Sequence, residues 1–213
     1  SVKVTGGQRI DLLGVKKEDL PKVWADLDMP SGHAYGKALR TVKTCVGSEW
    51  CRFGTQDSTQ MGIDLEKEFF KMWAPHKVKL AVSGCPRNCA EVAIKDVGII
   101  GVDSGWEVYV GGNGGIKTEV AQFLVKVKTP DEVLEYRGAF LQLYREEAHY
   151  LDRTVHYIER VGLDTVKKKI LDDNEGRHAL YERLMFALSV ERDPWVERAK
   201  EGKLKHEFET VDA

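Results

Sequence analysis

The sequence predicts an α+β fold in which strands come before about residue 129 and helices follow. Two β-rich runs at residues 97–102 and 106–110 flank a turn at residues 103–105, which is typical of a hairpin. Residues 129–132 (TPDE) combine a capping threonine, a proline at the first helical position and a capping-box glutamate, which predicts a helix start. The 213 residues, 42% of them hydrophobic and 31% charged, suffice for a packed core.

The N-terminal residues predict a strand pair followed by a short helix. Hydrophobic residues alternate on both sides of the Gly6–Gly7 break within residues 1–13, as in a hairpin or a bulged strand. Apolar residues then repeat at helical spacing, namely Leu20, Val23, Trp24 and Leu27. The Pro and Gly content of residues 29–36 predicts a loop.

In the middle of the chain, a cysteine-bearing segment, a helix and a strand are expected in turn. Residues 41–56 carry the first cysteine pair. A helix is predicted over residues 57–73 from four regularly spaced apolar residues: Met61, Leu65, Phe69 and Met72. The run HKVKLAVSG at residues 76–84 predicts a strand that leads directly into Cys85, and GGNGG at residues 111–115 ends the hairpin.

Helices are expected over most of the remaining chain. The first, opened at residue 129, is predicted to run well past Tyr144 with one apolar face: Val133, Tyr136, Phe140, Tyr144, Ala148 and Leu151. More helix is expected to about Val190. The last twenty or so residues are charged and weakly patterned, and are predicted to be extended or mobile.

Charge and hydropathy exclude some classes of partner. The formal net charge of −2 gives no reason to expect nucleic acid or an anionic membrane. No apolar run reaches membrane-spanning length, and the first residues lack a signal-peptide layout. Because the chain starts without Met in what reads as a strand, it is expected to be a piece of a larger or processed protein.

The chain has four cysteines in two close pairs: Cys45, Cys51, Cys85 and Cys89. Buried free cysteines are common, and an even number also suits disulfides in secreted proteins. Nothing marks this chain as secreted, and it is larger than the domains that need disulfides, so metal binding is the better interpretation. The C-x5-C and C-x3-C spacings favour a [4Fe–4S] cluster with four thiolate ligands over zinc. Zinc ribbons and fingers mostly use C-x2-C or C-x4-C spacings.

The residues around the cysteines resemble a known family. TCVGSEWCRFGTQDS at residues 44–58 and VSGCPRNCAEVAIKDVGIIG at residues 82–101, followed by GGNGG, are similar to the siroheme-containing nitrite and sulfite reductases. Within this family the similarity is closest to the C-terminal part of the large subunits of bacterial assimilatory NAD(P)H-dependent nitrite reductases. It covers about residues 1–195.

The resemblance implies the architecture and its division. It implies a mixed sheet with flanking helices of the nitrite/sulfite reductase haemoprotein type. Residues 1–40 are expected to be the remnant of a ferredoxin-like half-domain, residues 41–128 a siroheme and [4Fe–4S] domain, and residues 129–213 a helical extension and tail.

The same resemblance implies the reaction. The four cysteines are expected to bind a [4Fe–4S] cluster, with Cys89 also ligating the siroheme iron, so that electrons pass through Cys89 to siroheme. The expected reaction is six-electron reduction of nitrite to ammonium, with sulfite reduction as the alternative. FAD and NAD(P)H are expected only in upstream domains, a small subunit is a possible partner, and the expected location is the cytoplasm.

Reduction of an oxyanion needs positive charge and protons, which Lys77, Lys79 and Arg9 are expected to supply. The two lysines alternate along a strand and so share a face; a solvated lysine pair on an edge strand is the alternative. The family has an anion-binding arginine where this sequence has Gly7. Arg9, two residues on, is expected on the same face if the strand is regular.

Siroheme carries many carboxylates, so its pocket needs many donors. Matched motifs imply the cofactor-binding residues Thr5, Gln8, Arg52, Thr55, Gln56, Gly111, Gly112 and Asn113. Asn88 is expected to donate a hydrogen bond to a cluster sulfur, and Trp50 to shield the cluster from water. Two alternatives remain: a fragment that binds only an Fe–S cluster or zinc without activity of its own, and a purely structural thiol domain.

Overall fold

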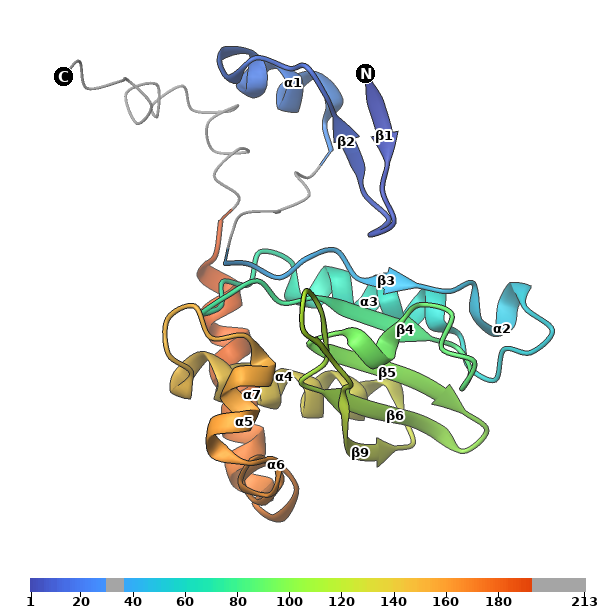
Figure 1. Ribbon diagram of the computed structural model, residues 1–213, viewed down its shortest axis with the longest axis vertical. Coiled ribbons are helices and arrows are strands. Elements are labelled where there is room, and N and C mark those ends of the chain that lie inside the picture. Colours follow the sequence, from blue (N-terminus) through green and yellow to red (C-terminus); the bar gives the residue numbers. More distant parts are fainter. Residues whose placement is uncertain (30–36, 193–213) are drawn as a thin grey trace.

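The computed structural model describes residues 1–29 and 37–192, and its largest element is a five-stranded mixed sheet of order β3-β4-β5-β6-β9 (Figure 1). The strands are β1 (Val2–Val4), β2 (Ile10–Leu12), β3 (Lys43–Thr44), β4 (Leu80–Ser83), β5 (Val97–Val102), β6 (Gly105–Val110), β7 (Asn113–Gly114), β8 (Thr118–Glu119) and β9 (Gln122–Val127). The helices are α1 (Leu20–Leu27), α2 (Gly47–Trp50), α3 (Ser58–Phe69), α4 (Pro130–Glu147), α5 (Thr154–Val161), α6 (Leu163–Lys167) and α7 (Asn174–Val190). Two short 3-10 turns, η1 (Lys17–Asp19) and η2 (Val92–Ile94), and a π-helical turn, η3 (Lys168–Asp172), complete the set. The expected α+β class and mixed sheet are confirmed.

The N-terminal strand pair is also confirmed. Strands β1 and β2 are antiparallel, with Val2 opposite Leu12 and Val4 opposite Ile10. Helix α1 follows at its predicted place. The loop predicted over residues 29–36 falls almost entirely outside the described residues, which resume at residue 37.

The main sheet changes direction halfway across. β4 pairs in parallel with both β3 and β5, whereas β5, β6 and β9 are successive antiparallel neighbours. The predicted hairpin is confirmed as β5 and β6, closed by the pair Val102 and Gly105. The strand expected over residues 76–84 is shorter, because β4 begins at Leu80 and only an isolated bridge between Leu39 and Val78 precedes it. Strand β9 was not predicted from the sequence.

The main core lies between one face of this sheet and helices α3 and α4. Leu80 and Val82 from β4 are buried against residues of these helices, including Leu65 and Phe140. The helix predicted over residues 57–73 ends earlier, at Phe69. Lys71, with a φ of 71°, is in the left-handed region, which an L-residue in a continuing helix does not adopt.

The helical extension begins as the sequence predicts. The Thr129 hydroxyl accepts the Glu132 N–H, and the Glu132 carboxylate accepts the Thr129 N–H, so the capping box is present. Helix α4 ends at Glu147, however, so the expectation that its apolar face includes Ala148 and Leu151 is wrong; Leu151 has a φ of 72° and is half exposed. Helix α7 packs along α4 and ends at Val190. The tail predicted to be extended or mobile falls on residues 193–213, outside the described residues.

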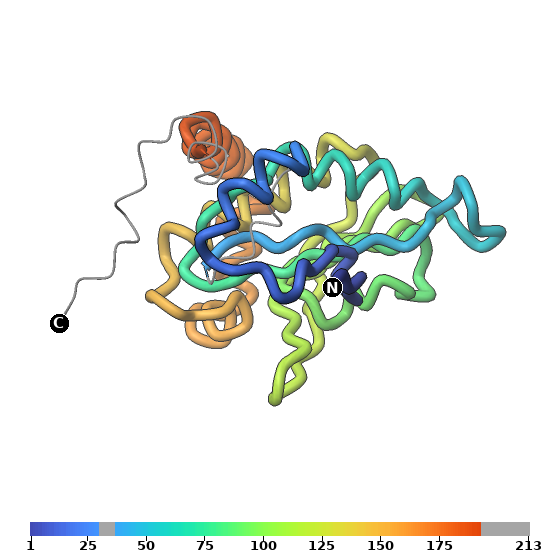
Figure 2. Tube along the Cα trace, turned by 90° about the horizontal axis from the view of Figure 1, so that it is seen from above, coloured from blue at the N-terminus to red at the C-terminus, as the bar shows by residue number. Residues whose placement is uncertain are grey.

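The opposite face of the sheet carries a small second core of Ala81, Ala90 and Val92, with η2 lying over it. The turn of the β1–β2 hairpin lies beside β3 (Figure 1), and the view from above places the hairpin over the sheet (Figure 2). Within residues 1–29 and 37–192, no helix is long and apolar enough to cross a membrane.

Candidate functional site

The two cysteine-bearing loops start at the ends of neighbouring parallel strands. Cys45 directly follows β3, and Cys85 lies two residues after the end of β4. Because parallel strands end at the same edge of a sheet, this topology brings the two loops together at a place where open α/β sheets commonly bind ligands.

The loops are joined by backbone hydrogen bonds, and we call this junction, formed by residues 45–48 and 54–58 against Gly84, the loop seam. The Gly84 carbonyl accepts the N–H of Thr55 at 2.8 Å, the hydroxyl of Thr55 at 2.9 Å and the N–H of Gln56 at 3.0 Å. In return, the Gly84 N–H donates to the Cys45 sulfur at 3.1 Å. The seam therefore fixes the first cysteine loop against the start of the second.

Two glycines make this approach possible. Gly47 has a φ of +64°, and a Cβ there would lie 2.6 Å from the Ser58 nitrogen. A Cβ on Gly84 would lie 2.6 Å from the Gln56 carbonyl oxygen. Both distances are shorter than real contacts allow, so these positions need the absence of a side chain.

Cys45 is in an environment that favours its thiolate. Burial raises the pKa of the thiol, but hydrogen bonds from the Gly84 N–H, the Ser58 hydroxyl and the Gly47 N–H outweigh it, and the pKa is lower than usual. The Ser58 oxygen lies 3.2 Å from the Cys45 sulfur. Ser58 was not singled out from the sequence, although it closes the matched motif at residues 44–58.

The four predicted ligands differ in exposure, and all four thiols are free. Cys85 is buried, Cys45 and Cys51 are partly buried, and Cys89 is exposed. Within the described ranges, no three His, Cys, Asp or Glu side chains are close enough to hold a single metal ion. The donor set still fits a cluster, because a cluster's thiolates bind separate iron atoms at the corners of a cube and stand further apart than the ligands of one ion.

Lys77 and Lys79 share a face of the sheet as predicted. Val78 between them is fully buried in the main core, so the partly exposed lysines lie on the opposite face, the face of Ala81 and η2. Burial lowers the pKa of Lys79, and the positive charges of Lys77, Arg153 and Lys95 lower it further.

The lysines and the cysteines lie at opposite ends of β4. Four residue steps separate Lys79 from Ser83, roughly 13 Å at a rise of about 3.3 Å per residue. The main chain of the lysine segment and the cysteine loop are therefore separated by the length of β4.

Arg9 lies in a turn and not in a regular strand, which corrects the sequence expectation. The Thr5 N–H donates to the Arg9 carbonyl at 2.8 Å and closes the turn. The guanidinium nevertheless folds back on Gly7, where a Cβ would lie 3.6 Å from the Arg9 Nη2. The Arg9 Nη1 is buried with no hydrogen-bond partner, which is the state of a donor that fits an anion.

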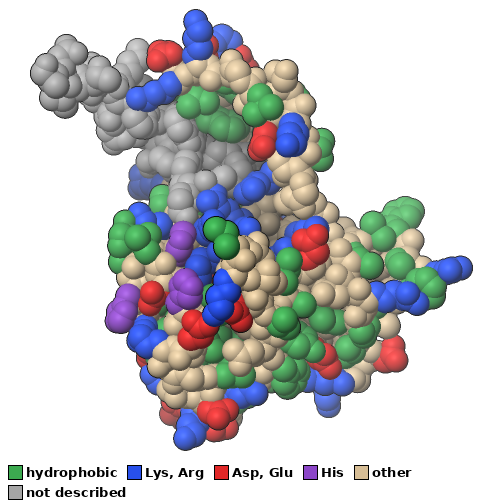
Figure 3. All heavy atoms as spheres, viewed as in Figure 1, with side chains coloured by type: hydrophobic (Ala, Val, Ile, Leu, Met, Phe, Trp, Pro, Cys, Tyr) green, Lys and Arg blue, Asp and Glu red, His purple; other side chains and the backbone are tan. Residues whose placement is uncertain are grey.

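Arg40 adds a further positive charge that was not predicted from the sequence. Burial and the charge of Arg9 lower the pKa of Arg40. Its N–H donates to the Val78 carbonyl at 2.8 Å, so it lies beside the lysine segment. Figure 3 shows Lys and Arg side chains gathered where the N-terminal hairpin meets the body of the molecule. The only sequence signal was its place five residues before Cys45.

Thr5 and Gln8, predicted to face a cofactor, are engaged within the protein. The Gln8 side chain accepts the Thr44 N–H at 2.8 Å and donates to the Thr44 carbonyl at 2.9 Å. The Thr5 hydroxyl accepts the Arg9 N–H at 3.2 Å. These two residues hold the hairpin turn and attach it to the residue before Cys45.

Other predicted residues hold the loops together. The Gln56 amide donates to the Val102 carbonyl at 2.9 Å, and the Asn113 amide to the Lys117 carbonyl at 2.9 Å. The Gly111 N–H donates to the Asp96 carbonyl at 2.9 Å, and a Cβ on Gly112 would lie 2.5 Å from the Lys95 carbonyl oxygen. Both glycines therefore serve close packing.

The tip of the first cysteine loop is exposed. Arg52 lies with its guanidinium carbon 4.5 Å from the centre of the Phe53 ring, and Arg87 lies 4.0 Å from the same centre. Trp50 is 75% exposed, and its shielding of a bound cluster from water stays a prediction. The carbonyl oxygen of the Asn88 side chain accepts the Val92 N–H at 2.6 Å. The amide nitrogen of Asn88 takes no part in this hydrogen bond and remains a donor.

Comparison with known proteins gives consistent matches. Residues 35–178 match the family described as "Nitrite and sulphite reductase 4Fe-4S domain". The chain is 62% identical over 211 residues to "Nitrite reductase [NAD(P)H]" of Bacillus subtilis (strain 168), covering 99% of this chain and 26% of that protein. It is 34% identical over 170 residues to "Sulfite reductase, assimilatory-type" of Nitratidesulfovibrio vulgaris, covering 80% of this chain and 78% of that protein. The chain thus spans about a quarter of the nitrite reductase.

Two solved structures share the fold. The Mycobacterium tuberculosis NirA protein aligns with a TM-score of 0.68 at 20% identity, over 79% of this chain and 34% of that chain. Dissimilatory sulfite reductase I (DsrI) aligns with a TM-score of 0.68 at 16% identity, over 92% of this chain and 63% of that chain.

Proposed function

Because the chain belongs to the nitrite and sulphite reductase 4Fe-4S domain family, we propose that it is the [4Fe–4S] and siroheme part of a reductase that converts nitrite to ammonium. The observation that carries the proposal is the loop seam, which holds Cys45 against the start of the Cys85 loop. The proposed division is a half-domain remnant at residues 1–40, the cofactor domain at 41–128, and the helical extension and tail at 129–213.

Cys45, Cys51, Cys85 and Cys89 would hold the cluster, and Cys89 would also reach the siroheme iron. When bound, these groups would relay electrons from the nicotinamide donor to the oxyanion. The lowered pKa of Cys45 suits a thiolate ligand, and the exposure of Cys89 leaves that sulfur accessible to a second metal group.

The chain's own cations would bind the substrate and move protons. Arg9, with its unpartnered buried Nη1, would bind the anion. Lys77 and Lys79 would donate protons as the nitrite oxygens leave as water. The lowered pKa of Lys79 suits this role, because an acid with a pKa nearer neutrality gives up its proton more readily.

Sulfite is the second candidate substrate. The chain covers 78% of a relative named as an assimilatory-type sulfite reductase, at 34% identity. A group of positive side chains of this kind would bind either small oxyanion. Nitrite is preferred because the 62% identical relative is named a nitrite reductase.

The remaining parts of the proposal concern the whole protein. FAD and NAD(P)H would bind other domains, because residues 1–213 contain no G-x-G-x-x-G motif. A small subunit is a further possible partner. We place the protein in the cytoplasm, where thiols stay reduced and nicotinamide donors are available.

The test is an anaerobic purification of the full-length protein, with a visible absorption spectrum and analysis of iron and acid-labile sulfide. The expected result is siroheme absorption, bound iron and sulfide, and consumption of nitrite with reduced nicotinamide, with sulfite assayed in parallel. Cys45→Ser is expected to lose most of the sulfide, whereas Ser48→Ala in the same loop keeps it. Purified protein that contains neither iron nor acid-labile sulfide contradicts the proposal. A preference for sulfite over nitrite supports sulfite as the substrate.

A further inference from the structure

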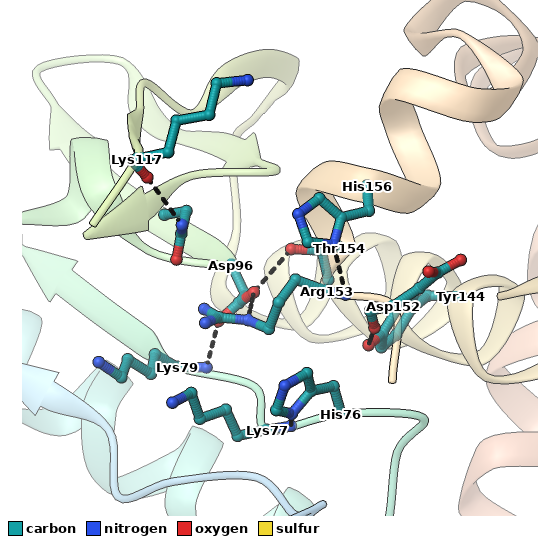
Figure 4. A network of polar contacts seen from close by, with 11 residues as sticks. His76, Lys77, Lys79, Asp96, Lys117, Tyr144, Asp152, Arg153, Thr154 and His156 are labelled. Atoms are coloured by element: carbon teal, nitrogen blue, oxygen red, sulfur yellow. Dashed lines mark hydrogen bonds and ion pairs between the residues drawn. The ribbon is translucent and has the colours of Figure 1, made fainter. Parts of the chain in front are cut away.

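Asp96 is a fully buried carboxylate in which both oxygens are saturated with hydrogen bonds (Figure 4). Its Oδ2 accepts the Lys79 N–H at 2.7 Å and the Arg153 Nη2 at 2.6 Å. Its Oδ1 accepts the Arg153 Nε at 3.0 Å and the Thr154 hydroxyl at 2.8 Å. Four donors occupy about all the positions a carboxylate offers, so its orientation is fixed.

This carboxylate holds the main chain of the lysine segment. Lys79 precedes β4, and its N–H is paired with the Asp96 side chain where a ladder bond would otherwise be. Its carbonyl accepts the N–H of Val97, the next residue after Asp96, at 3.3 Å. The Lys77 N–H is paired with the His76 ring nitrogen at 2.8 Å. The direction in which Lys79 points therefore depends on Asp96.

The charge of Asp96 is already neutralised, which explains why its carboxylate forms no ion pair with the nearby lysines. Arg153 neutralises Asp96 with a two-point contact, and both side chains are almost excluded from solvent. Among the described residues, no ion pair joins Lys77 or Lys79 to a carboxylate. Figure 4 shows the two lysine side chains running side by side away from the network. Their ammonium groups remain available for an anion.

Stability alone is a weak reason for such a pair, because a buried ion pair often gains little over apolar residues of equal volume. The network instead joins three distant parts of the chain at one point: the start of β4, the loop before β5 and the first residues of α5. The network therefore fixes the positions of these three segments relative to one another.

We propose that Asp96 is a positioning residue of the substrate site. It holds the main chain of Lys79, and Arg153 with Thr154 holds its carboxylate. This inference rests on the proposed function, in which Lys79 contacts the oxyanion.

The test uses the full-length holoenzyme and the variant Asp96→Asn. In either orientation its amide nitrogen faces a donor nitrogen of Arg153, and in one of them it also faces the Lys79 N–H. Hydrogen exchange of residues 77–80 is expected to speed up. The KM for nitrite is expected to rise about tenfold, in keeping with the cost of small misplacements, while the KM for nicotinamide and the visible spectrum stay unchanged. Glu135→Gln, which breaks the Arg177 ion pair between α4 and α7, is the matched control and changes none of these.

The outcomes separate the two proposals. Faster exchange with an unchanged KM for nitrite overturns the inference, as does unchanged exchange. If Asp96→Asn does not fold, Thr154→Val, which removes one of the four hydrogen bonds, is expected to give the same two shifts at smaller size, and their absence overturns the inference. A wild-type holoenzyme inert toward nitrite and sulfite contradicts the proposed function, while exchange at residues 77–80 still decides whether Asp96 holds Lys79.

Discussion

At the scale of single residues, Lys77 and Lys79 owe their shared face to Val78, which the main core buries completely. Lys77→Ala and Lys79→Ala are each expected to lower kcat/KM for nitrite by roughly 10²-fold, the range for loss of a positioned acid. The visible spectrum is expected to stay intact. Steady-state nitrite consumption measures the effect, with the exposed Lys168→Ala as control. Loss of the spectrum would instead mean that the lysines support cofactor binding.

Arg137 is a second residue with an unusual state. It is fully buried, its three guanidinium nitrogens have no hydrogen-bond partner, and its guanidinium carbon lies 3.6 Å from the centre of the Phe69 ring. Burial lowers its pKa to about 9, although Glu68 and Glu66 act in the opposite direction. An unsatisfied buried group of this kind costs stability.

Arg137→Met is therefore expected to raise the free energy of unfolding by about 1–3 kcal/mol, because it keeps an unbranched chain over Phe69 and removes the unpaired donors. Arg153→Met is the contrasting variant, because it strands the buried Asp96 charge and is expected to cost about 3–5 kcal/mol. Urea denaturation of both variants measures the difference. The same sign for both would contradict the interpretation.

At the scale of elements, the loop seam depends on the absence of side chains. Gly84→Ala is expected to push the Cys45 loop away from the start of the Cys85 loop, because the new Cβ would lie 2.6 Å from the Gln56 carbonyl oxygen. The expected result is less iron and sulfide per chain. Gly6→Ala is the matched control, since no atom lies within 4 Å of a Cβ there. Equal cluster content in both variants would refute the role of the seam.

Elements that depend on neighbouring residues could be predicted from the sequence, and two others could not. The capping box at Thr129 and the β5–β6 hairpin depend on residues close in sequence, and both were predicted. Strand β9 was not predicted, although its residues (QFLVKV) are rich in β-forming side chains; its place at the edge of the sheet beside β6 depends on pairing that only the folded chain shows. The end of α3 was missed because the buried Met72 continues the apolar spacing after the helix has stopped.

The residues of the candidate site also divide into those that the sequence pointed to and those that only the folded chain brings together. The cysteines were singled out from their local spacing, and the lysine pair from its alternation and the family resemblance; both sets stay predictions. Asp96 was not singled out, because its partners Arg153 and Thr154 are 57 and 58 residues away, and only the folded chain joins them. The contact of Gln8 with Thr44 was likewise not predicted, because these two residues are 36 positions apart in the sequence.

At the scale of the whole molecule, several tyrosines make stability fall at high pH. Burial and the hydrogen bond to Glu107 raise the pKa of Tyr109 to about 12, and burial also raises the pKa values of Tyr144, Tyr157 and Tyr181. The unfolded chain therefore loses these protons first, from about pH 10. The stabilisation is complete below that pH and is lost as the pH rises toward the folded values.

Unfolding free energies between about pH 9 and about pH 12 are expected to decrease steadily. Tyr109→Phe removes one of the contributing hydroxyls and is expected to make the decrease shallower. Chemical denaturation at each pH measures both curves. A flat wild-type curve in this range would show that the tyrosine environments do not favour the protonated form.

The loop seam also bears on protein engineering. Four cysteines copied onto another sheet would reproduce the ligands but not the distance between their loops. A transplant would also need Gly47 and Gly84, the Thr55 and Gln56 donors to the Gly84 carbonyl, and two adjacent parallel strands that end together. The smallest unit that could be transplanted is therefore the strand pair together with the backbone contacts between its loops. The cysteines alone would not reproduce the site.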